Sequence, residues 1–284
     1  MEFNIKKFEQ MAHDEIENIT LEPYRSPSGE EIQIKTTARD LGILATNDLL
    51  FREHIDKIVT TSRIVMGMLF RTFSTRDKNP MIKMFYPYVK SKLEYCCIVW
   101  SPVQQTYINE LEKIQKTFTS KIDGMEGLDY HERLEKLDLY SLERRRDRYF
   151  IIYGWQQLEG LKENVLGLKK SWIGTSRRIV SKGIPYQFEG RRLRRADTTK
   201  IHNCPARRVK RMFNNISAKN RNLSGITMNT FNLHLDTWLK TVPDLPRIGK
   251  YSRWVVAETN VSITVNCNLK QVFCIFACCS LIRN

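Results

Sequence analysis

The chain has 284 residues, of which 42% are hydrophobic and 27% are charged, a balance that permits a buried core and excludes broad disorder. No apolar run approaches the ~20 residues that span a bilayer, and the N-terminal MEFNIKKFEQ lacks the apolar core of a secretory signal. Seven cysteines without a regular framework indicate a reducing intracellular compartment, nuclear or cytoplasmic. Composition therefore excludes a membrane-spanning protein and a disulfide scaffold.

Positive charge is concentrated in one segment. Lys and Arg total 46 against 31 Asp and Glu, a net charge of +15, and residues 161–250 hold 20 basic side chains against 5 acidic ones. A field this concentrated favours a polyanionic partner, and nucleic acid is the polyanion that we expect. The alternative is a solvated basic surface without a partner.

Residues 1–45 have the pattern of short strands. The stretches 19–24 and 31–37 alternate apolar and polar residues, and Ser26-Pro-Ser-Gly29 between them has the composition of a turn. The sequence therefore predicts a small β-hairpin. Two strands this short need a larger structure to pack against, so we expect the remnant of a larger sheet.

Three amphipathic helices are predicted for residues 46–125. The spacing of apolar residues changes there to the helical period, and Asn47 or Asp48 can cap the first helix. The second helix opens at Asp77, and the third ends at Gly124. Three such helices with short connections form a compact bundle.

Helices are expected to continue over residues 126–170. Ser141 can cap a helix that runs to about Leu158. Its first turns contain four arginines, Arg144, Arg145, Arg146 and Arg148. Basic residues there oppose the helix dipole by about a few tenths of a kcal/mol each. A local rule broken in this way predicts either a binding role or pairing with Glu143 and Asp147.

The C-terminal part is expected to be less regular. Residues 171–224 are rich in Gly, Arg, Ser and Asn, and we expect a basic, loosely structured connector. Thr227 can cap a short helix in residues 225–250, and residues 251–284 form a tail that is either disordered or read-through sequence. The predicted fold class is mainly α, with a small N-terminal β-hairpin, a helical bundle and a basic, loosely structured C-terminal region.

The sequence lacks the motifs of common active sites. It contains no Gly-rich phosphate loop, no Gly-x-Ser-x-Gly elbow and no His-Glu-x-x-His pair. The tail cysteines lack zinc-knuckle spacing and are expected to be buried thiols, and the pair at 96–97 is expected in the core. These tail cysteines are Cys267, Cys274, Cys278 and Cys279. No two aspartates adjoin, so we expect neither a cofactor nor two-metal phosphoryl transfer in this chain.

Seven strings of residues follow one another in a fixed order. They are Ala38-Arg-Asp-Leu-Gly-Ile43, Phe51-Arg-Glu-His-Ile-Asp-Lys-Ile58, Tyr88-Val-Lys-Ser-Lys-Leu-Glu-Tyr95, Val99-Trp-Ser-Pro102, Leu111-Glu-Lys-Ile-Gln-Lys-Thr-Phe-Thr119, Tyr130-His-Glu-Arg-Leu134 and Leu139-Tyr-Ser-Leu-Glu-Arg-Arg-Arg146. Their order and spacing resemble the region just downstream of the polymerase palm in jockey-like non-LTR retrotransposon reverse transcriptases, which are RNA-directed DNA polymerases. The resemblance covers residues 3–160 and, less strongly, residues 200–250.

The resemblance implies that the helical bundle is a thumb, which clamps the primer–template duplex. It also implies that the palm, with its Mg²⁺-binding catalytic Asp pair, would precede Met1, so no residue of this chain is assigned to catalysis or to a metal. On this reading residues 1–45 are the last strands of a palm, and a palm-containing polypeptide is a further expected partner. The chain then looks like a fragment of a mobile element's polymerase.

Charge and resemblance together predict which residues contact the phosphates of an RNA–DNA hybrid or of RNA. The candidates in the helical part are Lys90, Lys92, Arg144, Arg145, Arg146 and Arg148. The candidates in the connector are Arg191, Arg192, Arg194, Arg195, Arg207, Arg208, Lys210 and Arg211. Two alternatives stay open, a domesticated non-enzymatic protein that binds protein or nucleic acid, and an intact polymerase completed by Asp residues supplied in trans.

Overall fold

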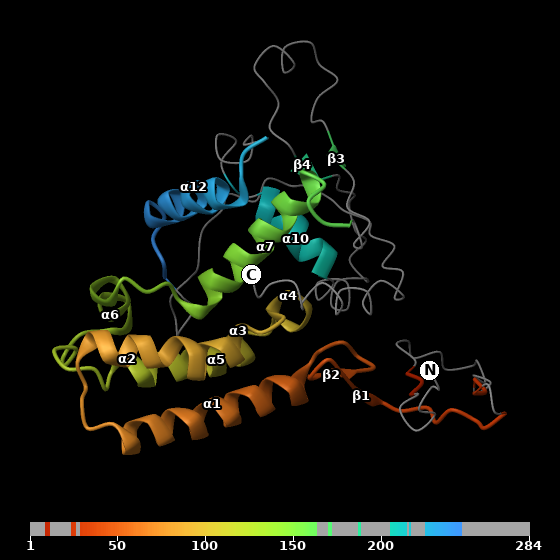
Figure 1. Ribbon diagram of the computed structural model, residues 1–284, viewed down its shortest axis with the longest axis horizontal. Helices are drawn as coiled ribbons and strands as arrows, with labels where there is room; N and C mark the ends of the chain where they lie inside the picture. The colour runs from red at the N-terminus through yellow and green to blue at the C-terminus, as the bar shows by residue number, and fades with distance from the viewer. Residues whose placement is uncertain are drawn as a thin grey trace, which may run out of the picture.

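The computed structural model describes most of the first 163 residues and several later stretches. The described residues are 9–11, 24–26, 29–163, 170–171, 187–188, 205–214, 216 and 225–245. They form a mainly helical molecule with a small antiparallel hairpin towards the N-terminus, which confirms the predicted fold class (Figure 1). The predicted tail at 251–284, with its four cysteines, lies outside the described residues.

The hairpin consists of β1 (Thr37–Asp40) and β2 (Ile43–Thr46). The two residues between the strands, Leu41 and Gly42, have φ values of 43° and 89°, the left-handed conformation that two-residue hairpin turns favour. Ile43 is fully buried, because β2 packs against the first helix. The hairpin is therefore anchored to the core by its second strand.

The turn predicted at residues 26–29 is present. The Ser26 N–H donates to the Glu30 carbonyl at 2.8 Å, and Arg25 pairs with Glu31 in an antiparallel bridge. Most of the first predicted strand lies outside the described residues, and the second forms only isolated bridges up to β1. The paired strands thus lie further along the chain than predicted.

The first helix, α1 (Arg52–Thr72), begins after Phe51, whose backbone is left-handed with φ of 54°. Asp48 does not cap this helix. Its carboxylate accepts hydrogen bonds from the Leu50 N–H at 2.9 Å and from the Thr46 hydroxyl at 2.6 Å. The predicted cap is therefore wrong, because Asp48 stabilises the turn that leads into the helix.

The second helical stretch changes its period in the middle. α2 (Lys78–Phe85) begins after Asp77, as predicted, and continues through a π-helical turn, η2 (Tyr86–Lys90), into α3 (Ser91–Glu94). A π turn inserts an extra residue and so rotates the faces of the residues near it. Tyr88, which the helical period places on the buried side, is consequently 54% exposed.

The third predicted helix, α5 (Gln105–Thr119), lies beside α1 (Figure 1). Leu111, Ile114 and Phe118 are buried at the spacing of one helical face. The ring of Phe118 stacks on that of Phe85 from α2, with 4.3 Å between the centroids. The three amphipathic helices predicted for this region are all present and share a core.

Three helices follow or flank the bundle: α4 (Cys97–Trp100), α6 (Tyr130–Leu137) and α7 (Leu142–Leu158). The cap predicted for α7 is confirmed, since the Ser141 hydroxyl accepts the Arg144 N–H at 3.0 Å. α7 is buried around nearly its whole circumference and is the central helix of the molecule (Figure 1). The thiols of residues 96 and 97 are buried, as predicted.

α10 (Pro205–Asn214) lies inside the segment that was predicted to be loosely structured. Val209 and Phe213 are fully buried against α7, and Gly154 permits this close approach. The prediction of loose structure is wrong for these residues, because Ala206 and the two others form an apolar helical stripe among the arginines. β3 (Lys170–Ser171) and β4 (Gln187–Phe188) form a second short antiparallel pair.

The last described helix is α12 (Met228–Lys240), and its predicted cap is confirmed. The Thr227 hydroxyl accepts the Thr230 N–H at 3.2 Å. Phe231 of α12 stacks on Trp155 of α7, with the ring planes 8° apart and the centroids separated by 4.4 Å. This contact joins α12 to the central helix.

Candidate nucleic-acid interface

The arginine run of α7 lies inside the molecule. Arg144 and Arg146 are each 2% exposed, and Arg145 and Arg148 are half-buried. The run is enclosed because α7 has α5, α10 and α12 around it (Figure 1). The structure therefore gives most of these side chains protein surroundings.

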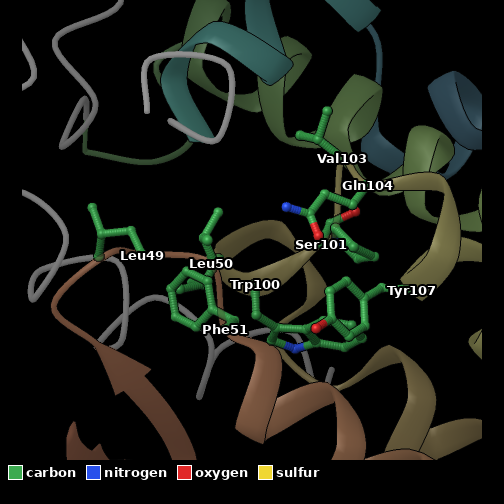
Figure 2. Close-up of a pocket in the computed structure, with 10 residues that line it drawn as sticks. Leu49, Leu50, Phe51, Trp100, Ser101, Val103, Gln104 and Tyr107 are labelled. Atoms are coloured by element: carbon green, nitrogen blue, oxygen red, sulfur yellow. The ribbon is translucent and has the colours of Figure 1, made fainter. Parts of the chain in front are cut away.

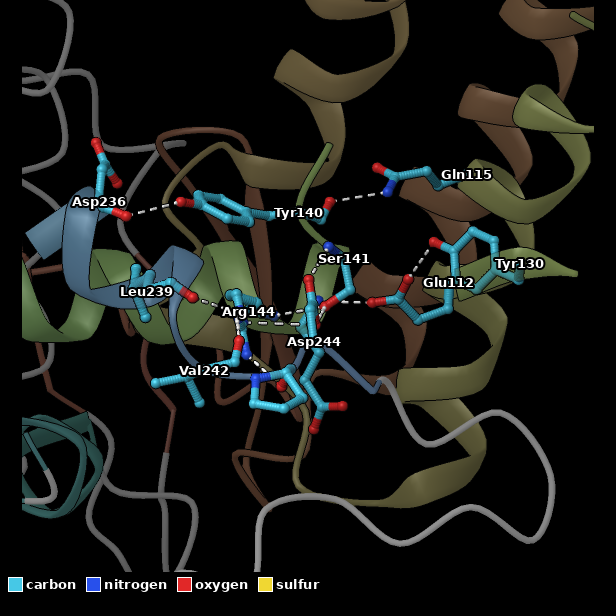
Figure 3. Close-up of polar contacts among 12 residues, drawn as sticks. Glu112, Gln115, Tyr130, Tyr140, Ser141, Arg144, Asp236, Leu239, Val242 and Asp244 are labelled. Atoms are coloured by element: carbon cyan, nitrogen blue, oxygen red, sulfur yellow. Dashed lines mark hydrogen bonds and ion pairs between the residues drawn. The ribbon is translucent and has the colours of Figure 1, made fainter. Parts of the chain in front are cut away.

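Arg144 binds the end of α12. Its guanidinium donates to the carbonyls of Leu239 at 2.8 Å and of Val242 and Pro243 at 2.5 Å (Figure 3). Asp244 lies 3.5 Å from its Nε and also accepts hydrogen bonds from Ser141. Burial raises the pKa of Asp244. A cation at a helix C-terminus satisfies free carbonyls and suits the helix dipole, so Arg144 holds α12 in place.

Arg145 and Arg148 each pair with a carboxylate from another helix. Arg145 binds Glu94 of α3 through two nitrogens, and the Tyr149 hydroxyl donates to the same carboxylate at 3.0 Å. Arg148 binds Asp236 of α12 in the same forked manner, at 2.5 and 2.8 Å. The structural alternative considered for these arginines is thus realised with partners distant in sequence.

Arg146 and Arg208 are buried without such a carboxylate. Arg208 of α10 is 5% exposed, donates to the Ser101 carbonyl and lies 5.8 Å from the centre of the Phe150 ring. Its Nε, and both terminal nitrogens of Arg146, have no hydrogen-bond partner. Phosphates of a duplex cannot reach either side chain in this conformation.

Two of the predicted lysines are also buried. Lys90 is 1% exposed, and its ammonium lies 3.9 Å from the centre of the Tyr86 ring. Burial and the charge of Arg145 lower the pKa of Lys90 to about 7. Lys210 is 6% exposed. Neither side chain presents its charge at the surface.

Two predicted residues, Lys92 and Arg211, are exposed. The backbone of Arg207 lies in α10, but the structure does not describe its side chain. The remaining predicted residues, Arg191, Arg192, Arg194 and Arg195, lie outside the described residues. Of the predicted contacts that the structure describes, these two exposed residues therefore keep the accessibility that a phosphate contact requires.

Sequence reasoning missed a second group of cations. Within the described residues, six exposed basic side chains besides Lys92 make no side-chain hydrogen bond or ion pair. They are Arg39, Lys57, Arg71, Lys83, Lys116 and Lys121. Most of them occupy the polar faces of α1, α2 and α5, and the helical period of the apolar residues in those helices could have identified them.

A buried carboxyl group stabilises the junction between α5 and α7. Glu112 is fully buried and accepts hydrogen bonds from the Tyr130 hydroxyl at 2.7 Å and the Glu143 N–H at 2.6 Å (Figure 3). Burial raises the pKa of Glu112 to about 7, although the charge of Arg146 opposes the shift. Both oxygens of this carboxyl face protein groups, so its position indicates a structural role.

One pocket opens beside the end of α4 (Figure 2). Its walls come from residues 49–51 before α1, from residues 99–103, and from Gln104 and Tyr107 at the start of α5. The lining is mostly apolar and includes no carboxylate, histidine or cysteine. The pocket therefore offers no group for acid–base or nucleophilic chemistry.

Within the described part of the chain, no three His, Cys, Asp or Glu side chains gather closely enough to hold a metal ion. None of these residues is thus assigned to the Mg²⁺ that the resemblance implies for the complete enzyme. Among the same residues, no helix has the length and apolar character needed to cross a membrane.

Comparisons with protein-family models, with curated proteins and with solved structures gave no match. The resemblance to reverse transcriptases therefore rests on the residue strings alone.

Proposed function

We propose that this chain binds the phosphate backbone of an RNA–DNA hybrid or of RNA, as the thumb-like part of a reverse transcriptase similar to those of jockey-like non-LTR retrotransposons. On this proposal the chain grips nucleic acid without carrying out the polymerase reaction. A palm-containing polypeptide would supply that chemistry.

The observation that carries the proposal is the separation of cations into two groups. The arginines of α7 bind protein carbonyls and carboxylates, whereas the exposed cations on α1, α2, α3 and α5 have no described hydrogen bond or ion pair. Unpaired exposed cations on a packed helical scaffold are free to neutralise phosphates. The net charge of +15 adds a long-range attraction for polyanions.

Such an interface gives affinity without reading base sequence. Lysine and arginine contacts to phosphate position a duplex but carry no direct sequence information. Binding should therefore depend strongly on salt and weakly on sequence. If six phosphates are neutralised, the logarithm of the association constant should fall with the logarithm of the salt concentration with a slope of about −5.

The proposal is tested by fluorescence anisotropy with a labelled RNA–DNA hybrid at several salt concentrations. The test variant replaces four unpaired cations by glutamine: Lys57→Gln, Arg71→Gln, Lys116→Gln and Lys121→Gln. Each lost phosphate contact should make the salt slope less negative by about 0.9. The variant should also bind more weakly than the natural chain at low salt.

A matched control removes the same charge from exposed cations that already have carboxylate partners. It carries Lys35→Gln, Arg63→Gln, Lys113→Gln and Lys240→Gln. We expect the control to keep most of the natural salt slope. Equal losses in both variants would show a general charge effect and contradict a local interface. A natural chain that does not bind the hybrid would contradict the proposal itself.

A second candidate function is the recruitment of a protein partner. Ile64 and Met68 lie one turn apart on α1 and are 58% and 53% exposed. Two such side chains on one helix face favour a contact with another polypeptide. A defined oligomer in size-exclusion chromatography that Ile64→Ser abolishes would support this function, whereas a monodisperse monomer would count against self-association.

A further inference from the structure

Two arginines lie near each other inside the molecule without a carboxylate between them. Arg146 comes from the central helix α7 and is 2% exposed, and Arg208 comes from α10 and is 5% exposed. Together they leave three nitrogens buried without a hydrogen-bond partner, Nη1 and Nη2 of Arg146 and Nε of Arg208. These nitrogens can only donate, so they require acceptors.

The two guanidinium groups lie close enough to influence one another and a common neighbour. The charge of Arg146 lowers the pKa of Arg208, and both arginines interact electrostatically with the thiol of Cys97. Burial and the neighbouring charges of Arg211 and Arg146 lower the pKa of Arg208 to about 9. Arg146, Arg208 and Cys97 therefore surround one region between α4, α7 and α10.

Nearby acidic groups do not neutralise this pair. Within the described residues, no carboxylate oxygen lies within ion-pair distance of Arg146 or Arg208. Glu112 acts on Arg146 only at longer range, and its oxygens already bind the Tyr130 hydroxyl and the Glu143 N–H. Two like charges in the interior, each with unpaired donors, carry a large desolvation cost.

We propose that a small inorganic anion, either chloride or a phosphate-like oxyanion, binds between α7 and α10 and accepts hydrogen bonds from Arg146 and Arg208. Forked guanidinium donors are well suited to such anions, and burial strengthens the attraction. The site is separate from the proposed nucleic-acid interface, because a phosphodiester strand cannot enter a region in which both side chains are at least nine-tenths buried. The bound anion would hold α10 against the central helix.

Thermal unfolding of the full chain tests the proposal. Sodium chloride and sodium phosphate are titrated separately at constant ionic strength, with sodium gluconate as the balancing salt because its anion is too large for a buried site. A saturable rise of Tm with chloride or with phosphate is expected, and the more effective salt identifies the anion class. No saturable rise with either salt would overturn the proposal.

Variants locate the effect. Arg146→Met and Arg208→Met remove the donors while filling similar volume, so each should raise the half-saturating anion concentration at least tenfold. Arg71→Met, an exposed arginine with no described hydrogen bond or ion pair, is the matched control and should leave that concentration unchanged. A saturable response that survives in both test variants would overturn the assignment to these residues.

A direct measurement keeps the proposal falsifiable if a variant fails to fold. Broadening of the ³⁵Cl magnetic resonance line by the natural chain reports chloride exchange, and added phosphate should reverse the broadening if the two anions share the site. Absence of broadening, together with no phosphate-dependent rise of Tm, would contradict the proposal.

Discussion

Arg144 illustrates how the same residue type has different roles at different depths. In the first turn of α7 its charge opposes the helix dipole, yet its guanidinium lies at the C-terminal end of α12, where a cation is favourable. The sequence shows the conflict at α7 but not the compensation, because the partners of Arg144 lie 95 to 99 residues away. A run of arginines can therefore indicate internal structure as readily as a binding surface.

Replacing Arg144 should loosen α12. In Arg144→Leu three carbonyls lose their donor and Asp244 loses its nearby cation, so we expect the free energy of unfolding to fall by about 3–5 kcal/mol. Urea denaturation measures the loss, and hydrogen exchange should show it first at residues 228–245. Arg63→Leu, which breaks an exposed ion pair, should cost less than about 1 kcal/mol. Equal losses in the two variants would contradict the role given to Arg144.

The elements were predictable wherever their signals are local. Ser141 and Thr227 cap the helices that they were expected to cap, because a capping hydroxyl acts within three residues. Phe51 could not be foreseen as the residue before α1, since its left-handed backbone is imposed by surrounding packing. α10 was missed because its apolar stripe is short and lies in a strongly basic segment, where composition suggested a loop.

The same limit applies to the candidate interface. Exposure of a cation depends on which helix face it occupies and on carboxylates supplied by distant helices. Lys92 was predicted and is exposed, whereas Lys90, two residues earlier, is buried by the π turn. Charge runs thus identified the basic character of the chain, but the helical period was needed to separate surface cations from internal ones.

Contact between α7 and α10 should depend on Gly154. A Cβ placed there would lie 3.1 Å from Val209 Cγ1 and 3.2 Å from two atoms of Phe213, distances that require these neighbours to move. Gly154→Val should therefore destabilise the chain by about 1–3 kcal/mol through overpacking. Gly67→Val is the matched control, because Gly67 lies within α1 and a Cβ added to it would have no neighbouring atom within 4 Å, so this change should be close to neutral. Urea denaturation compares the two, and a similar result for both would contradict close packing at Gly154.

At the scale of the whole molecule, two buried titratable groups oppose each other. Glu112 is fully buried with a pKa of about 7, and His54, 3% exposed and edge-on to Trp100, has its pKa lowered to about 4 by burial and by the charge of Lys57. The raised pKa of Glu112 gives stability that is present below its ordinary value of 4.5 and is lost as pH rises through 7. The lowered pKa of His54 gives stability that is present above its ordinary value of 6.5 and is lost as pH falls through 4.

These two contributions have opposite slopes between about pH 4.5 and 6.5 and should largely cancel in the natural chain. Glu112→Gln removes the first, so its stability should rise with pH relative to the natural chain, by about 3 kcal/mol between pH 4 and 8. His54→Asn keeps an acceptor for the Leu44 N–H and should show the reverse trend, by a similar amount between pH 7.5 and 3. Urea denaturation at unit steps of pH measures both differences. Parallel curves for the natural chain and the two variants would show that neither group titrates differently in the folded state, and would contradict the burial of both.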